Sequence, residues 1–156
     1  MHRVPNVKLR GNLGWTLVEM ILVLMIFGTL LAIAQPALRD WLDQAKIARA
    51  ITDIEAIQAD LAGWEFLEGR LPASLAEIDR ANSRDPWGNP YQYLRFQGAA
   101  SGSMRKDRFL VPINSTYDLY SMGKDGKTSA PLNSTAGKDD IVRANDGAFI
   151  GLAATF

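Results

Sequence analysis

The sequence predicts an α+β fold in which one long N-terminal helix packs on a small antiparallel sheet. Two observations lead to this prediction. Apolar and helical patterns continue from about Thr16 to Glu68, and short alternating segments bounded by turn residues follow them. The 156 residues suffice for one ordinary domain. A helix of that length is about 75 Å long, so its first half needs lipid or other subunits as a cover.

The first half of the predicted helix has the composition of a membrane span. Residues 15–34 carry a single charged side chain, Glu19, and about 20 apolar residues cross the hydrocarbon core of a bilayer. A charge inside such a segment costs about 2.5–3.5 kcal/mol on insertion scales. Glu19 therefore indicates a task, and we expect the task to involve a partner that the isolated chain does not supply.

The charge pattern predicts an orientation in the membrane. Residues 1–14 contain Arg3, Lys8 and Arg10 and no acidic residue, whereas the rest of the chain is mildly acidic. By the positive-inside rule the N-terminus stays cytoplasmic and the rest crosses the membrane. No segment is basic enough to indicate a nucleic-acid surface. The sequence has no cysteine, so packing or a metal must hold its loops.

Two simpler interpretations of the N-terminus leave something unexplained. A secretory signal peptide has an apolar core of about 7–15 residues, which is shorter than the segment found here, and Glu19 is unusual in such a core. A plain membrane anchor accounts for the length and the orientation. It does not account for Glu19.

The second half of the helix is expected to be amphipathic. Pro36 removes a backbone donor and is expected to kink or loosen the helix at that point. From Ile47 to Trp64 apolar residues recur at spacings of three and four, with charged residues on the opposite face. Gly69 suits the C-terminal cap, and Pro72 prevents continuation.

The remainder reads as turns and short strands. Residues 75–78 resemble one helical turn, residues 85–90 are dense in turn formers, and residues 97–107 read as a mobile Gly/Ala/Ser-rich hairpin. Alternating apolar and aromatic residues predict three strands. They cover residues 91–96, 108–113 and 117–122.

A polar loop after the last predicted strand carries three carboxylates near its two ends, Asp125, Asp139 and Asp140. Carboxylate and carbonyl oxygens are the ligands that Ca²⁺ prefers. The Asp-Gly and Asp-Asp pairs are also ordinary turn residues on a solvated surface. The spacing alone leaves both interpretations open, since it is not that of an EF-hand.

The N-terminal motif resembles the processing site of type IV pilins and of the pseudopilins of type II secretion. The string GWTLVE covers residues 14–19. The resemblance implies that a membrane-embedded prepilin peptidase cuts after Gly14 and methylates the new N-terminus, Trp15, which stands where the family usually has Phe. It implies that Glu19, the fifth mature residue, pairs with the Trp15 amine of a neighbouring subunit. Pro36 falls where this family commonly has a proline.

Further motifs resemble the G-type major pseudopilin of type II secretion. They are GRLP at residues 69–72, DPWGNPYQY at 85–93, YDLYSMGKDG at 117–126 and DDI at 139–141. The resemblance implies a pilin-like fold with a C-terminal calcium-binding loop and one structural Ca²⁺. The implied ligands are Asp125, Asp139 and Asp140 with the backbone carbonyls of Met122 and Lys127. Residues 129–137 make the loop longer than usual, which leaves Lys127 and the choice between Asp139 and Asp140 open.

The resemblance also implies an organisation and a function. Residues 1–14 would be a leader, residues 15–35 a single-pass inner-membrane and assembly helix, and residues 36–156 a periplasmic domain. Copies would polymerise into a periplasmic filament that drives protein export across the outer membrane. Expected partners are further copies, minor pseudopilins, prepilin peptidase and the inner-membrane assembly platform. The chain has no P-loop motif, so a separate ATPase would supply the energy.

Two alternatives are weighed against this function. A type IV pilin would build surface fibres for adhesion, twitching or DNA uptake, but many such pilins close their C-terminal loop with a disulfide. A membrane-anchored periplasmic enzyme has little support, because the sequence has no cysteine, a single histidine in the leader (His2) and no serine-centred elbow. The sequence therefore predicts a structural protein and not an enzyme.

Overall fold

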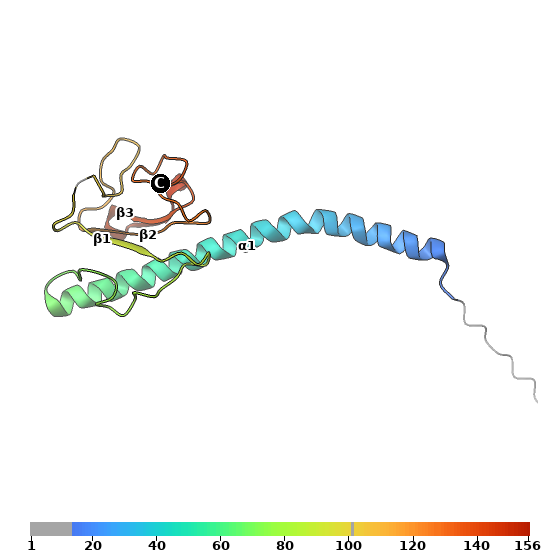
Figure 1. Ribbon diagram of the computed structural model, residues 1–156, viewed down its shortest axis with the longest axis horizontal. Coiled ribbons are helices and arrows are strands. Elements are labelled where there is room, and N and C mark those ends of the chain that lie inside the picture. The colour runs from blue at the N-terminus through green and yellow to red at the C-terminus, as the bar shows by residue number, and fades with distance from the viewer. Residues whose placement is uncertain (1–13, 101) are drawn as a thin grey trace, which may run out of the picture. The chain divides into compact units, whose positions relative to one another are not determined.

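The computed structural model describes residues 14–100 and 102–156 (Figure 1). The chain divides after Trp41 into two compact units, the second of which is Leu42–Phe156. Helix α1, Leu17–Glu68, contributes to both. The basic residues Arg3, Lys8 and Arg10 of the predicted leader lie outside the described residues.

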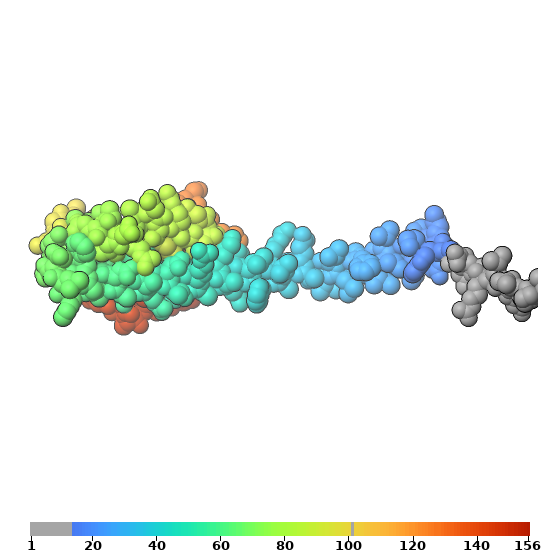
Figure 2. Space-filling view, turned by 90° about the horizontal axis from the view of Figure 1, so that it is seen from below, coloured from blue at the N-terminus to red at the C-terminus, as the bar shows by residue number. Residues whose placement is uncertain are grey.

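In the first unit the residues of α1 are exposed, except for the half-buried Val23. Leu17 is 77 % exposed, Leu24 69 % and Ile33 75 %. Figure 2 shows this part of the chain in blue. In the described part of the chain, α1 is the one helix long and apolar enough to cross a membrane. Pro36 lies inside the helix, which continues past it, so the predicted helix is confirmed from Leu17 to Glu68.

The second unit contains an antiparallel sheet in the order β1-β2-β3-β4. Tyr93 of β1 faces Leu119 of β2, and Ser121 of β2 faces Ile141 of β3. The strand bounds are β1 Gln92–Arg95, β2 Tyr117–Ser121, β3 Ile141–Ala144 and β4 Phe149–Leu152. Two short 3₁₀ helices, Asn145–Gly147 and Ala153–Thr155, flank β4.

The sheet has a core on each face. The second half of α1 lies along one side of the sheet (Figure 1). Its residues at helical spacing pack with side chains of the strands and of the segment after the helix. This core contains Ala50, Ile54, Ile57, Leu61, Leu75, Tyr91, Tyr117, Leu119 and Ile141. Alternation along the strands sends Val142 and Ala144 to the other face, where they meet Ile113 and Leu132 of the loops and Ala153 of the last 3₁₀ helix.

Two of the three predicted strands are confirmed, and the one at residues 108–113 is wrong. There Asp107 accepts hydrogen bonds from the backbone N–H groups of Phe109 at 2.8 Å and Val111 at 2.9 Å. Leu110 has a φ of 63°. An aspartate that binds the backbone ahead of it favours a tight turn over a strand. Residues 75–78 form turns instead of a helical turn.

Candidate functional site

Glu19 lies in the first turn of α1, where it forms a reciprocal cap with Thr16. Its Oε2 accepts a hydrogen bond from the Thr16 backbone N–H at 2.8 Å and another from the Thr16 hydroxyl at 2.8 Å. The Glu19 N–H in turn donates to the Thr16 hydroxyl oxygen at 3.2 Å. This is a capping box, which satisfies backbone donors that have no partner within the helix.

The capping box is a local role of Glu19 that was not predicted from the sequence. The isolated chain does supply hydrogen-bond donors for the Glu19 carboxylate, and the Thr-x-x-Glu spacing of Thr16 and Glu19 was the signal for it. The bonds hold the carboxylate at the start of the helix, which begins two residues after Trp15. Gly14 and Trp15 are both exposed and precede the helix.

The turn at residues 85–90 anchors the start of the loop that carries the predicted calcium ligands. Asp85 Oδ1 accepts hydrogen bonds from the N–H groups of Trp87 at 3.0 Å and Asn89 at 2.8 Å. The hydroxyl of Ser121, at the end of β2, donates to Asp85 Oδ2 at 2.5 Å. The same hydroxyl oxygen accepts the N–H of Gly123 at 3.0 Å, and Asn89 Nδ2 donates to the Gly123 carbonyl at 3.0 Å.

The two ends of this loop meet at Gly123 and Asp139. Gly123 has a φ of 63°, and a Cβ placed on it would lie 2.2 Å from the Asp139 carbonyl oxygen. The Asp139 carboxylate reaches back across the junction, where its Oδ2 accepts the N–H groups of Lys124 at 2.9 Å and Asp125 at 3.1 Å. Only glycine combines this backbone conformation with so close an approach.

The three carboxylates of the loop lie in three different environments. Asp125 is exposed, and its Oδ1 accepts the N–H of Lys127 at 2.8 Å. Asp139 is half-buried against the junction at Gly123. Asp140 is fully buried. Met122, directly after β2, is half-buried, and Lys127 is exposed.

Asp140 binds an arginine from a distant part of the chain. Its Oδ2 accepts hydrogen bonds from the Arg105 guanidinium at 2.5 Å and from the Thr128 hydroxyl at 2.7 Å. Arg105 is itself only 2 % exposed. Burial raises the pKa of the Asp140 carboxyl to about 6, against the opposing effects of Thr128 and Arg105, so the group is largely ionised at neutral pH.

The loop as arranged does not fit Ca²⁺. The ion takes 6–8 oxygen ligands at about 2.3–2.6 Å, but residues 14–100 and 102–156 bring no three acidic, histidine or cysteine side chains together as a metal site. Asp140 has one oxygen on a guanidinium, which offers donors and no lone pair. Its other oxygen, Oδ1, is buried without a hydrogen-bond partner.

Sequence reasoning missed Arg105, because it lies in the segment interpreted as a mobile hairpin. The structure fixes the end of that segment: Lys106 forms isolated bridges to Pro112 and Pro131. Arg105 is followed by Lys106, Asp107 and Arg108, and a charged stretch of this kind indicates a solvated surface and not a buried side chain. The contact of Arg105 with Asp140 spans 35 residues of sequence.

A second polar cluster ties the end of β3 to the loop before β2. The Asn114 amide donates to Asp118 Oδ1 at 3.0 Å, and its oxygen accepts from the Arg143 guanidinium at 3.1 Å. The Asp146 carboxylate accepts from the Ser115 hydroxyl at 2.6 Å and the Ser115 N–H at 2.9 Å. The Ser115 hydroxyl is the main reason that the pKa of Asp146 is lowered.

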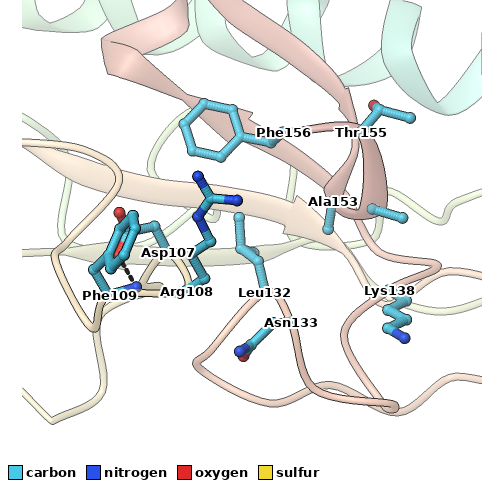
Figure 3. Close-up of a pocket in the computed structure, with 10 residues that line it drawn as sticks. Asp107, Arg108, Phe109, Leu132, Asn133, Lys138, Ala153, Thr155 and Phe156 are labelled. Carbon is cyan, nitrogen blue, oxygen red and sulfur yellow. Dashed lines mark hydrogen bonds between the residues drawn. The ribbon is translucent and has the colours of Figure 1, made fainter.

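A cavity of about 590 Å³ lies beside the loop (Figure 3). Aromatic rings of Phe109 and Phe156 line it together with the basic side chains of Arg108 and Lys138. Its one carboxylate, Asp107, is already bound to the backbone of Phe109, as the dashed line in Figure 3 marks. The lining therefore presents no paired acid and base.

Comparison with known proteins finds curated relatives along most of the chain. This chain is 31% identical to the type II secretion system core protein G of Pseudomonas aeruginosa, and the match covers 80% of this chain and 92% of the relative. The core protein G of Aeromonas hydrophila is 27% identical, over 85% and 92%. The type IV major pilin protein PilE of Neisseria gonorrhoeae is 26% identical, over 86% of both. No family model and no solved structure matches the chain.

Proposed function

The chain belongs to the family of type II secretion system core protein G, and from this premise we propose that it is the structural subunit of a secretion pseudopilus. It is made with a leader at residues 1–14, processed after Gly14 by a prepilin peptidase, and held in the inner membrane by residues 15–35. Residues 36–156 lie in the periplasm. Processed copies polymerise into a filament that drives protein export across the outer membrane.

The observation that carries this proposal is the uncovered first half of α1. Its large apolar side chains are exposed from Leu17 to Ile33, and in water such a surface is unfavourable by about 25 cal/mol per Å². Lipid covers it before assembly, and the same segment of neighbouring subunits covers it afterwards. Pro36 lies at the end of this segment, within α1.

The capping box gives Glu19 its place in assembly. The carboxylate is held at the helix start by Thr16, next to the residue whose amine processing would create. In the filament the Trp15 amine of a neighbour pairs with this carboxylate, and in a low-dielectric setting an ion pair with hydrogen bonds is tolerated where a lone charge is not. The pair sets the axial register between subunits.

The experiment compares Glu19→Gln with Thr16→Ala. Glu19→Gln keeps the size of the side chain and removes its charge, so we expect normal membrane insertion and loss of filaments. Thr16→Ala removes the hydroxyl of the cap but keeps the carboxylate and its hydrogen bond from the backbone N–H of residue 16, so filaments should persist. Membrane fractionation and recovery of sheared filaments after overproduction measure the two steps. Normal filament recovery from Glu19→Gln would refute the role of the ion pair.

The second candidate function is that of a type IV pilin, and the likeness to the gonococcal pilin favours it. The partners would then belong to a pilus and not to a secretion system; for the pseudopilus they are minor pseudopilins and the inner-membrane assembly platform. Deletion of the gene separates the two. Lost export with intact surface fibres supports the pseudopilus, and lost surface fibres with intact export supports the pilin.

A further inference from the structure

The loop between β2 and β3 is held closed by an ion pair with an arginine of the same chain, Arg105. The Arg105 guanidinium donates to Asp140 Oδ2 and to the Thr128 hydroxyl, and the Thr128 hydroxyl donates to the same carboxylate oxygen. Arg105 is 2 % exposed and Asp140 is fully buried. A buried carboxylate needs a partner of opposite charge, and here the partner is an arginine.

The structure holds this arginine firmly in position. The Arg105 backbone N–H donates to Asp118 Oδ2 at 2.6 Å, and its carbonyl accepts the N–H of Ile113 at 3.1 Å. The guanidinium lies 4.4 Å from the centre of the Tyr120 ring, a distance at which a cation is attracted to the aromatic face. Main chain and side chain are thus both fixed, and the guanidinium is preorganised for the carboxylate.

The extra length of the loop is attached to the same arginine-bearing segment. Lys106, directly after Arg105, donates its N–H to the Ala130 carbonyl at 2.8 Å and accepts the N–H of Leu132 at 2.9 Å. Residues 129–137, which make the loop longer than the family pattern, therefore run against this segment. The side chain of Arg105 and the backbone of Lys106 therefore both hold the longer loop in place.

We propose that the Arg105 guanidinium replaces the calcium ion that the family resemblance implies. It neutralises the Asp140 carboxylate, so that the loop of residues 122–140 is held closed without a bound metal. A guanidinium neutralises one carboxylate, Asp140, and leaves Asp125 and Asp139 to bind backbone N–H groups. A divalent cation at Asp140 would lie beside a guanidinium of the same sign, which opposes binding. This inference does not depend on the proposed filament function.

Calcium titration of the unaltered chain tests the proposal. The full-length protein is purified in detergent micelles, and its thermal unfolding is followed by circular dichroism in excess EGTA and in about 2 mM CaCl₂, a concentration that saturates sites of extracellular type. A ligand that binds the folded state raises the melting temperature by mass action. We expect the same midpoint in both, and no retained ⁴⁵Ca²⁺ in equilibrium dialysis. A rise of several degrees, or stoichiometric binding, would overturn the proposal.

Variants of the ion pair provide the second arm of the test. Arg105→Ala leaves a buried carboxylate without its partner, and we expect the midpoint to fall by about 10 °C or more. The control Arg80→Ala removes an arginine that is paired with Asp60 at 2.7 Å but is partly exposed, and it should change the midpoint by only a few degrees. Equal effects of the two would contradict a special role for Arg105.

Removing both charges distinguishes a charge partner from a general packing role. The double variant Arg105→Gln with Asp140→Asn keeps the side-chain shapes approximately and should melt above Arg105→Ala. A double variant that melts lower than Arg105→Ala would overturn the pairing. Where Arg105→Ala fails to fold at all, the calcium titration of the unaltered chain still decides the question.

Discussion

Replacing Gly123 by alanine is the most direct perturbation of the junction that closes the loop. The new Cβ would lie 2.2 Å from the Asp139 carbonyl oxygen, 2.7 Å from its carbonyl carbon and 2.8 Å from Oδ2. These atoms belong mainly to the backbone and cannot rotate away. Asp139 must therefore move as a whole, and its two hydrogen bonds to the N–H groups of Lys124 and Asp125 are strained or lost.

The expected loss of stability follows from two contributions. A residue other than glycine at a φ of 63° costs about 1–2 kcal/mol. Hydrogen bonds to a charged group contribute about 1.5–3 kcal/mol each, and the displacement of Asp139 removes at least one. Together they amount to about 2.5–5 kcal/mol. For a unit of roughly 100 residues each kcal/mol lowers the melting temperature by about 4–8 °C, so we expect a fall of at least about 10 °C.

Gly69→Ala is the matched control for this substitution. Gly69 has a nearly equal φ of 68°, but a Cβ there meets nothing within 4 Å, so only the conformational cost of about 1–2 kcal/mol remains. Urea unfolding of both variants, followed by tryptophan fluorescence, gives the difference in free energy of unfolding. Equal losses for the two variants would refute the close approach of Gly123 to Asp139 as the origin of the effect.

Two further predictions concern the core and the response to acid. Leu119→Ala, at a fully buried position of β2, should lower the free energy of unfolding by about 2–5 kcal/mol, whereas Leu67→Ala, which is 80 % exposed, should leave it nearly unchanged in the same urea assay. The pKa of Asp146 is lowered in the folded state, so its contribution is present above the ordinary carboxyl pKa of 3.8 and is lost as the pH falls through the lowered value. Asp146→Asn should thus have a lower free energy of unfolding than the unaltered chain at pH 6, and the two values should approach each other as the pH falls below 3.8. A difference in free energy of unfolding that does not depend on pH would contradict the assignment.

The regular parts of the fold were accessible from sequence, because their signals are local. The helix ends at Glu68, where Gly69 supplies the left-handed cap, with its N–H bound to the Glu65 carbonyl at 2.9 Å. Strand β2 shows its alternation over five residues. Strands β3 and β4 were missed: each has only four residues, and the segment between them, Asn145–Gly147, is a 3₁₀ turn. Strand β1 is equally short, but it lies within the alternating aromatic segment of residues 91–96, whereas the residues of β3 and β4 show no such alternation.

The arrangement of the loop was not accessible, because it depends on contacts far apart in sequence. The turn former Asn89 was recognised as such, but its bond to Gly123 crosses 34 residues. Arg105 meets Asp140 across 35 residues, and both lie in segments without periodicity. The family resemblance named Asp139 and Asp140 as calcium ligands and left the choice between them open. In the structure Asp139 binds the loop backbone and Asp140 binds the core arginine.

The position of the buried residues along α1 has a mechanical consequence. In the described part of the helix the fully buried side chains are Ala50, Ile54, Ile57 and Leu61, and none lies earlier. Withdrawal of residues 17–35 from the bilayer therefore breaks no contact of the folded core. Extraction of a subunit from the membrane therefore has to overcome the contacts of this segment with lipid. The domain from Leu42 onward can remain folded during extraction.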